Sequence, residues 1–270
     1  MTYRHKNKQV IFCLARGYTH TEMYKYRKLV LRNLLLRINM KRYKSKWDYL
    51  IFHEGNIGKF HQFIIKFFSL NFSIEFISVQ SDFKLPDFAT QFKFKNLGYI
   101  LMCRFHSLQV WKYLEEYQIA MRVDDDVFIL NLNPILKNRV FDCAQIGEET
   151  HMLTNLTFPK YLKTIGMESF YDHNFPYTNF YITRPDFWLQ RSVQSLIAQI
   201  ASNPESVLNR WGDLPILGVV LNRFRDKNEN FLRRDISYYH FSHRATIKNG
   251  IRLPGFYLNA FLKSKSWDFQ

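Results

Sequence analysis

Short apolar runs alternate with longer amphipathic segments through the first half of the chain, and this alternation limits the possible folds more than any other feature. The apolar runs have the length of buried strands and cover residues 9–15, 47–52 and 73–79. Segments 22–40 and 57–70 between them have helical patterns. A strand–helix–strand–helix–strand order predicts an α/β fold, with a mostly parallel central sheet flanked by helices.

The remaining elements are assigned from the same patterns. We expect a loop at 81–96, one long helix at 97–117 and a buried strand at 120–123 that runs into three aspartates, with 127–129 after them. In the second half, the expected strands are 142–147, 178–183 and 231–239, and the expected helices are 185–201 and 214–224. The side chains of the first helix that we expect to face the core are Leu29, Leu31, Leu34, Leu35 and Ile38. Because no repeat or linker divides the chain, a single domain is predicted.

The chain is strongly basic, with 38 Lys and Arg against 23 Asp and Glu and a formal net charge of +15. Such a charge attracts polyanions, namely nucleic acid, an anionic membrane surface or phosphorylated small molecules. No RNA-binding, zinc-finger or helix-turn-helix pattern accompanies it, so no specific nucleic acid is expected as a partner. The apolar content of 47% supports a sizeable core and excludes a disordered chain.

The cysteines and the N-terminal region indicate a cellular compartment. Cys13, Cys103 and Cys143 lie far apart without a metal-finger spacing, as expected of reduced thiols. The run 10–15 is too short and too poorly flanked for a signal peptide, and no segment has the length of a transmembrane helix. We therefore expect a cytoplasmic protein that is not secreted. Its basic surface and aromatic tail at 256–262 favour peripheral contact with an anionic membrane at the inner face.

Asp124, Asp125 and Asp126 directly follow a buried apolar strand. Three carboxylates this close repel one another unless a cation compensates them. Side chains alternate along an extended segment, so we expect Asp124 and Asp126 on one side and Asp125 on the other. Two oxygens on one side can hold Mg²⁺ or Mn²⁺ and leave positions open for substrate phosphates. A solvated acidic turn is the alternative interpretation.

Six short segments, taken in order, match the motif series of a known family. They are His53-Glu54-Gly55, Cys103-Arg104-Phe105-His106-Ser107, Arg122-Val123-Asp124-Asp125-Asp126-Val127, Thr178-Asn179-Phe180-Tyr181-Ile182 with Asp186-Phe187-Trp188, Arg210-Trp211-Gly212-Asp213-Leu214-Pro215, and Asp235-Ile236-Ser237-Tyr238-Tyr239-His240. The series resembles that of the fungal α-1,2-mannosyltransferases of glycosyltransferase family 15. In that family the third segment reads Arg-Val-Glu-Pro-Asp-Val and the fourth reads Ser-Asn-Phe-Glu-Ile. The resemblance covers residues 10–245.

The resemblance implies a GT-A fold, which is a nucleotide-sugar-binding α/β domain. It implies transfer of mannose from GDP-mannose, with retention at the anomeric carbon, onto a hydroxyl of a glycan or glycolipid. The transfer would depend on Mn²⁺ (or Mg²⁺). Within a single domain of residues 1–270, it implies a nucleotide-binding half at 9–130, an acceptor-binding half at 131–245 and a C-terminal extension at 246–270.

The resemblance also implies a set of site residues. The family's metal carboxylates fall on Asp124 and Asp126, and its metal-binding histidine falls on His240. An imidazole beside carboxylate and diphosphate oxygens suits Mn²⁺ better than Mg²⁺. Asp125 is expected to bind ribose or donor sugar, and Arg16 and Arg104 are expected to contact base or diphosphate. The full set of expected nucleotide and sugar contacts is Arg16, Arg104, Asp124, Asp125 and Asn179.

Tyr181 departs from the family pattern, because a glutamate occupies this place in the family. A carboxylate there could form a covalent intermediate or stabilise the glycosyl cation, which a neutral tyrosine does poorly and an ionised phenolate could do. The departure is compatible with a different donor or acceptor, with lost activity, or with a front-face mechanism in which the leaving phosphate takes the acceptor proton. Tyr181 and Asp213 are the predicted catalytic residues, with Asp213 as a base or hydroxyl-binding group. For Asp213 the alternative is capping the helix that starts at Leu214.

Two other functions are compatible with the same residues. A metal-dependent nucleotidyl- or phosphotransferase also uses clustered aspartates in a basic groove, but it would not release GDP from a GDP-sugar. An inactive relative that binds polyanions would show salt-dependent binding without any effect of metal. The acceptor, the linkage and the oligomeric state are left open by the sequence.

Overall fold

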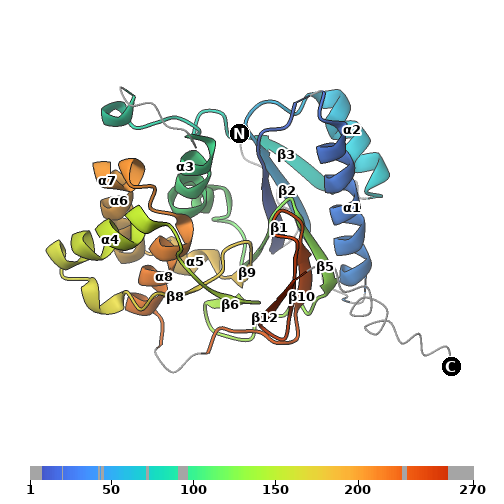
Figure 1. Ribbon diagram of the computed structural model, residues 1–270. Coiled ribbons are helices and arrows are strands. Elements are labelled where there is room, and N and C mark those ends of the chain that lie inside the picture. The colour runs from blue at the N-terminus through green and yellow to red at the C-terminus, as the bar shows by residue number, and fades with distance from the viewer. Residues whose placement is uncertain are drawn as a thin grey trace.

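A computed structural model describes residues 8–19, 21–41, 43, 46–70, 73–90, 97–226 and 230–254. A six-stranded sheet forms its centre (Figure 1). The strand order across this sheet is β3 (Ile74–Ser78), β2 (Asp48–His53), β1 (Gln9–Ala15), β4 (Ile119–Val123), β9 (Phe180–Thr183) and β6 (Phe141–Cys143). The first four strands are parallel, whereas β9 runs antiparallel to β4 and β6 runs antiparallel to β9. The predicted α/β fold with a mostly parallel sheet is therefore confirmed.

The direction in which strands are added to this sheet reverses at β1. The chain places β2 and β3 on one side of β1 and then returns to place β4 on the other side. In open parallel sheets, ligands bind outside the carboxyl ends of the strands at such a reversal. Gly17 and Tyr18 follow the carboxyl end of β1, and Asp124 follows the carboxyl end of β4. The topology alone therefore brings these segments to the expected ligand-binding edge.

Two groups of helices cover the two faces of the sheet (Figure 1). One face, with Ile11, Cys13 and Ile51, packs against α1 (Met23–Met40) and α2 (Lys59–Phe68). The opposite face, with Phe12 and Phe52, packs against the helical segment that begins with α3 (Leu97–Arg104). Side chains alternate between the faces along each strand, so both faces of these continuous apolar strands are buried.

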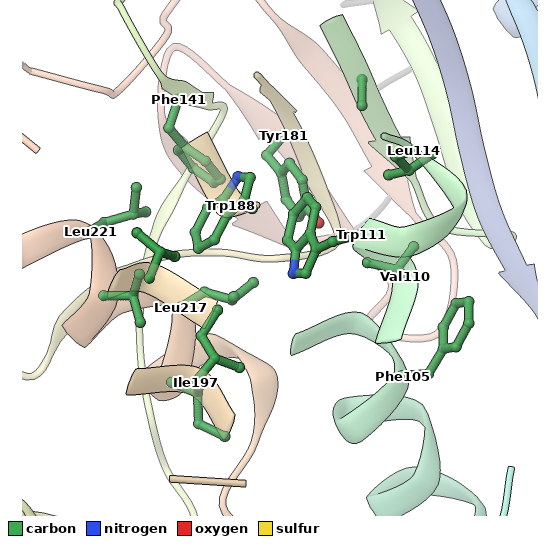
Figure 2. Close-up of a cluster of buried hydrophobic side chains, with 14 of the residues drawn as sticks. Phe105, Val110, Trp111, Leu114, Phe141, Tyr181, Trp188, Ile197, Leu217 and Leu221 are labelled. Carbon is green, nitrogen blue, oxygen red and sulfur yellow. The ribbon is translucent and has the colours of Figure 1, made fainter. Parts of the chain in front are cut away.

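Aromatic side chains dominate the core on the second face (Figure 2). Trp111 and Trp188 stack with ring centroids 4.7 Å apart and an interplanar angle of 8°. Their indole N–H groups donate to the Ser107 carbonyl at 2.9 Å and to Thr183 Oγ1 at 2.7 Å, so neither polar tip is left unpaired. Apolar residues of α6 (Arg191–Ser202) and α8 (Asp213–Phe224) complete this core.

A second, antiparallel sheet lies beside the first. Its order is β12 (Ile251–Pro254), β11 (Ala245–Lys248), β10 (Ser237–His240) and β5 (Val127–Asn131). β5 belongs to the first half of the chain, yet it pairs with β10 near the C-terminus. Residue 130, near which the nucleotide-binding half is predicted to end, lies in β5, and residues after 245 contribute to β11 and β12 of this sheet. Sequence patterns do not reveal this pairing of distant segments, and the division into two halves and an extension stays a prediction.

The expected helix 97–117 is divided into three parts. A π-helical turn at Phe105–Gln109 and a 3₁₀ turn at Val110–Tyr113 follow α3. Phe105, His106 and Ser107 are buried in succession, which a regular helix packed on one face could not achieve. The expected helix 185–201 is also divided, into α5 (Pro185–Trp188) and α6, because the chain turns to place Trp188 in the core.

The inward face predicted for α1 is partly wrong. Leu31 and Ile38 are exposed, whereas Arg32 and Asn39 are buried. Arg32 Nη2 donates to the carbonyl of Val123, and Asn39 Nδ2 donates to a carbonyl of β5 at 3.2 Å. Buried carbonyls of β4 and β5 accept hydrogen bonds from α1, so polar side chains of this helix face the core where hydrophobic periodicity predicts leucines.

Some short elements were missed or merged by the sequence patterns. The expected strand 142–147 is divided between β6 and β7 (Ile146–Glu148), and β7 pairs with β8 (Asn174–Pro176) in a separate ribbon. Unpredicted helices occur as α4 (Met152–Thr164), which contains a proline, and α7 (Pro204–Leu208). Short 3₁₀ turns lie at Asp87–Ala89 and Glu168–Phe170.

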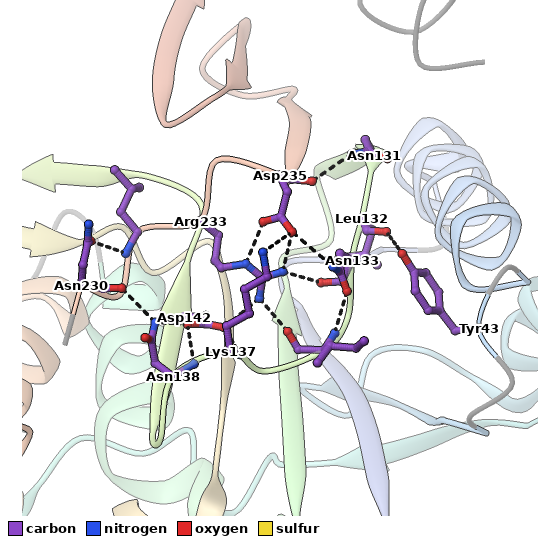
Figure 3. Close-up of polar contacts among 12 residues, drawn as sticks. Tyr43, Asn131, Leu132, Asn133, Lys137, Asn138, Asp142, Asn230, Arg233 and Asp235 are labelled. Atoms are coloured by element: carbon purple, nitrogen blue, oxygen red, sulfur yellow. Dashed lines mark hydrogen bonds and ion pairs between the residues drawn. The ribbon is translucent and has the colours of Figure 1, made fainter. Parts of the chain in front are cut away.

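A buried arginine fixes the segment that enters β10 (Figure 3). Arg233 Nη1 donates to Asp142 Oδ2 at 2.8 Å and to the Ile135 carbonyl at 2.6 Å. Its Nε and Nη2 donate to the two carboxylate oxygens of Asp235 at 2.7 and 2.9 Å. This network anchors the chain immediately before it enters β10 (Ser237–His240).

Among the residues that the structure describes, no helix is both long and apolar enough to cross a bilayer. Cys13, Cys103 and Cys143 are buried and free, as expected of reduced thiols. The aromatic tail at 256–262 lies outside the described residues.

Candidate active site

The three aspartates form a turn at the carboxyl end of β4. The Val127 backbone N–H donates to the Asp124 carbonyl at 3.1 Å, which closes the turn between β4 and β5. A turn does not keep the alternation of a strand, and each aspartate contacts a different partner. Asp124 pairs with Arg122 and Asp126 pairs with His240, and the expected use of Asp124 and Asp126 as a same-side metal pair stays a prediction.

Asp126 and His240 come together through strand pairing. His240 of β10 lies opposite Val127 of β5, and its Nε2 is 3.4 Å from Asp126 Oδ1. The Ser242 backbone N–H donates to Asp126 Oδ2 at 3.2 Å. Burial alone would raise the pKa of Asp126, but His240 and Ser242 together hold that pKa well below its usual range. Asp126 is thus an ionised carboxylate beside an imidazole nitrogen.

Two further side chains orient His240. Tyr238 Oη donates to Asn179 Oδ1 at 2.8 Å, so the Asn179 amide nitrogen is free to donate to His240 Nδ1 at 3.0 Å. With Nδ1 accepting, a neutral imidazole carries its proton on Nε2, which faces Asp126. Asn179 was expected to contact nucleotide or sugar, but it is buried and holds the histidine instead.

Arg122 joins Asp124 to Asp213. Its Nε donates to Asp124 Oδ1 at 2.7 Å, and its Nη1 donates to Asp213 Oδ2 at 2.6 Å. Arg122 and Asp213 are buried, whereas the Asp124 side chain is 23% exposed. Burial raises the pKa of Asp124 to about 6, although Arg122 opposes this shift. Asp213 is the first residue of α8 and Gly212 is its cap, so the capping alternative for Asp213 is not what the structure shows.

Asp125 connects the ends of β1 and β4. Tyr18 Oη donates to Asp125 Oδ2 at 2.8 Å, and Lys28 Nζ of α1 lies 3.8 Å from the same oxygen. Burial and the neighbouring Asp125 carboxylate raise the pKa of Tyr18 well above its usual value, so its phenol stays protonated and donates. These contacts lie at the sheet edge where the strand order reverses, which is the expected ligand-binding position.

Of the two predicted arginine contacts, Arg16 lies at this edge and Arg104 does not. Arg16 is exposed after β1, and its guanidinium lies over Gly98, where an added Cβ would be 2.6 Å from Nη1. Glu54 supports this loop by accepting a hydrogen bond from the Gly17 backbone N–H at 2.7 Å. Arg104 instead donates to the Ala201 carbonyl, which makes it a contact between α3 and α6.

Tyr181 lies inside the core (Figure 2), in correction of its expected place at the substrate. Its ring centroid is 5.0 Å from that of Phe141 and 6.2 Å from that of Phe12. Its hydroxyl has no hydrogen-bond partner among the described residues. Burial raises the pKa of Tyr181 above its usual value even though Arg122 opposes the shift, so a phenolate is disfavoured at neutral pH. Tyr181 thus supplies neither a carboxylate nor a phenolate to a reacting sugar.

Some residues of this site were not predicted. Arg122 belongs to the third motif, in which residue type alone indicates no role for it. It stands two residues before Asp124, and such a spacing along a strand places both side chains on the same face. Tyr18 and Lys28 carried no sequence signal, because their contact with Asp125 depends on the packing of α1. His243 has its ring centroid 4.3 Å from that of His240 and was missed because it lies in the β10–β11 turn.

The side chains at this edge of the sheet supply some of the ligands that a Mn²⁺ ion needs. Asp126 and His240 offer an ionised oxygen and a ring nitrogen, which is the mixed donor set that Mn²⁺ accepts. Asp124 is held by Arg122, and the described part of the chain contains no cluster of three or more His, Cys, Asp or Glu that could hold a metal. Two protein donors leave several positions for phosphate oxygens and water.

Comparison with known proteins found a similar curated protein and similar solved structures. No family model matches the sequence. The O-glycoside alpha-1,2-mannosyltransferase homolog 2 of Schizosaccharomyces pombe is 25% identical over 170 residues, with 53% of this chain and 46% of that protein covered. This chain therefore spans about half the length of the curated relative that it matches.

Two solved structures are similar over most of this chain. Core-mannan synthase A from Aspergillus fumigatus, in its Mn/GDP form, gives a TM-score of 0.70 at 16% identity and covers 89% of this chain and 76% of that one. The mannosyltransferase Ktr4p from S. cerevisiae gives a TM-score of 0.72 at 17% identity and covers 94% and 74%. At such identities the likeness shows the fold, which is of the GT-A type. The sequence resemblance to α-1,2-mannosyltransferases is confirmed by these relatives.

Proposed function

We propose that this chain, which shares its fold with mannosyltransferases, transfers mannose from GDP-mannose to a hydroxyl of a glycan or glycolipid with the aid of Mn²⁺. The observation that carries the proposal is the pair of Asp126 and His240, 3.4 Å apart at the carboxyl edge of the sheet. This edge is where nucleotide ligands bind in open α/β sheets. A solved structure of the same fold is a Mn/GDP form, which supports the choice of metal and nucleotide.

Each residue at this edge has a proposed task. Asp126 Oδ1 and His240 Nε2 hold the metal, and Asn179 and Tyr238 keep the imidazole in place. When bound, Mn²⁺ neutralises the charge that develops on the diphosphate leaving group. To bind the ion through Nε2, His240 would carry its proton on Nδ1, and the Asn179 amide would turn its oxygen toward Nδ1 to accept that proton in a hydrogen bond. Arg16 and Lys28 supply positive charge at the same edge for the diphosphate.

The carboxylates divide into one that substrate can reach and one that it cannot. Asp124 is partly exposed, and we assign to it a contact with the donor or acceptor. Asp213 is buried against Arg122, so we assign to it the positioning of that guanidinium and not the role of a free base. Since Tyr181 supplies no nucleophile, we propose front-face transfer with retention. The acceptor oxygen bonds to the anomeric carbon as the bond from that carbon to phosphate breaks, and the departing phosphate oxygen takes the acceptor proton.

Asp126→Asn tests the metal site most directly. Removing one ionised ligand should weaken Mn²⁺-dependent binding of GDP by about 10- to 100-fold and lower GDP release from GDP-mannose. Binding is measured by thermal shift and calorimetry with and without Mn²⁺, so the result does not depend on turnover. Asp186→Asn is the matched control, because Asp186 is exposed and pairs with Arg184 on the surface. Unchanged Mn²⁺-dependent binding in Asp126→Asn would refute the metal assignment.

The same assays separate the alternative functions. A nucleotidyl- or phosphotransferase would bind nucleotide with metal but would not release GDP from GDP-mannose. A polyanion-binding relative would bind heparin in a salt-dependent way and show no effect of Mn²⁺.

A further inference from the structure

The α2 helix presents an aromatic row to solvent. Phe60, Phe63 and Phe67 follow one another at intervals of three and four residues, so they share one face of the helix. They are 71%, 61% and 51% exposed, whereas Ile65, on the opposite face, is fully buried. The rings of Phe63 and Phe67 stack on each other with centroids 6.1 Å apart. A monomeric soluble protein rarely exposes so many large apolar side chains together, and such a patch marks an interaction site.

The neighbouring helix α1 also presents apolar side chains to solvent. Tyr24, Leu31 and Ile38 recur every seven residues and are exposed. α1 and α2 cover the same face of the sheet (Figure 1), and they contact each other through Tyr26 and His61, whose rings stack at 4.5 Å. We call the outward faces of α1 and α2 the α1–α2 face, comprising Tyr24, Leu31, Ile38, Phe60, Phe63 and Phe67.

The charge of these helices identifies the chemistry that would cover them. Neither α1 nor α2 contains an acidic residue. From residue 23 to residue 70 the sequence has eleven Lys and Arg and two acidic residues. Lys59 and Lys66 each directly precede a phenylalanine of the exposed row, and Lys59 is itself exposed. Aromatic and basic side chains on one helix, without acidic ones, are typical of helices that lie in the interface of an anionic bilayer.

A second copy of the chain is a poor occupant of the same surface. Two α1–α2 faces in contact would bring two sets of Lys and Arg together without acidic partners from these helices. Such juxtaposition of like charges opposes association. An anionic lipid surface instead offers a partner for the lysines and an apolar boundary for the phenylalanines.

We propose that the α1–α2 face docks on a bilayer that contains anionic lipids, with α2 parallel to the membrane plane and its phenylalanines inserted. This site is separate from the transferase site, and it stands whether or not the proposed activity is correct.

Co-sedimentation of the full chain with vesicles tests the proposal. Vesicles of phosphatidylcholine with phosphatidylglycerol are compared with vesicles of phosphatidylcholine alone. The wild type should bind the anionic vesicles and should bind them less at high salt. The double variant Phe60→Ser with Phe63→Ser should lower the partition coefficient by about tenfold or more. Each inserted ring stabilises the bound state because its apolar area leaves water for the bilayer. Lys59→Glu with Lys66→Glu should also lower the partition coefficient on anionic vesicles. On vesicles of phosphatidylcholine alone, this variant and the wild type should have the same partition coefficient.

The matched control changes exposed apolar residues elsewhere. Met152→Ser with Leu156→Ser alters α4, where both side chains are exposed but lie outside the α1–α2 face. This control should bind as the wild type does, and circular dichroism should show that all variants fold. The proposal would be overturned if the control and the phenylalanine variant lost vesicle binding equally, or if the wild type did not bind the anionic vesicles. A dimer in light scattering that Phe60→Ser with Phe63→Ser abolishes would also overturn it and assign the face to a second copy.

Discussion

Arg122→Met removes the cation that lies between two carboxylates beside the expected metal site. The arginine is 2% exposed and donates to Asp124 at 2.7 Å and to Asp213 at 2.6 Å. Methionine keeps a flexible apolar stem of similar reach, so the substitution retains much of the packing and removes the charge. Asp213 would then be a buried carboxylate that has lost its paired cation.

The size of the effect follows from the burial of each partner. Breaking a buried ion pair by removing one partner costs about 3–5 kcal/mol, because the remaining charge stays desolvated. The contact with Asp124 contributes less, since that side chain is partly exposed and water screens it. We therefore expect the free energy of unfolding to fall by about 3–5 kcal/mol, mostly through Asp213.

Urea unfolding at neutral pH, followed by circular dichroism, measures this loss. Arg184→Met is the matched control, because Arg184 pairs with Asp186 on the surface, where the side chains are 48% and 61% exposed. Surface pairs of this kind contribute about 0–1 kcal/mol, so the control should unfold close to the wild type. The reasoning from burial would be refuted if Arg122→Met lowered the free energy of unfolding no more than Arg184→Met does.

A double-mutant cycle isolates the pair itself. Asp213→Asn removes the other charge, and the double variant with Arg122→Met no longer contains an unpaired carboxylate at this place. Its destabilisation should be smaller than the sum of the two single losses by about 0.5–3 kcal/mol. Strictly additive losses would show that the two groups do not interact in solution.

Three further predictions concern the site and the core. Tyr181→Phe should change the unfolding free energy by less than about 1 kcal/mol and leave GDP release unchanged, because the hydroxyl has no hydrogen-bond partner among the described residues. A large loss of turnover at unchanged stability would contradict the buried placement. Asn179→Ala should weaken Mn²⁺ binding by about 10- to 100-fold in calorimetry, since His240 loses the group that orients it. Wild-type affinity would show that the imidazole does not need this support. Trp111→Ala should cost about 3–5 kcal/mol in urea unfolding, because the stacked Trp188 would border a large cavity. A loss below about 1 kcal/mol would mean that the core collapses around the deletion.

The parallel strands of the sheet could be predicted from the sequence because their signal is local. The apolar run at 9–15 has the same limits as β1 (Gln9–Ala15), and the other runs agree with β2, β3 and β4 to within about two residues at each end. A strand that is buried on both faces must be apolar along its whole length, so its sequence is enough to identify it.

The inward face of α1 could not be predicted in the same way. Periodicity predicts that leucines of this helix face the interior, but carbonyls of β4 and β5 require hydrogen-bond donors from it. Arg32 and Asn39 satisfy them, and the helix is rotated so that Leu31 and Ile38 face solvent. This need for donors arises only when α1 lies across those strands, which no local pattern records.

The site shows the same division between sequence and tertiary structure. The motif series by itself predicted Asp124, Asp126, His240 and Tyr181 as site residues, because residue type and order are properties of the sequence. Which of them meet was decided by strand pairing: β5 beside β10 brings Asp126 to His240, and β9 beside β4 places Tyr181 opposite Arg122 in the core. In the turn after β4, Asp124 contacts Arg122 and Asp126 contacts His240. Contacts between distant residues depend on pairing, register and burial, and these exist only once the chain has folded.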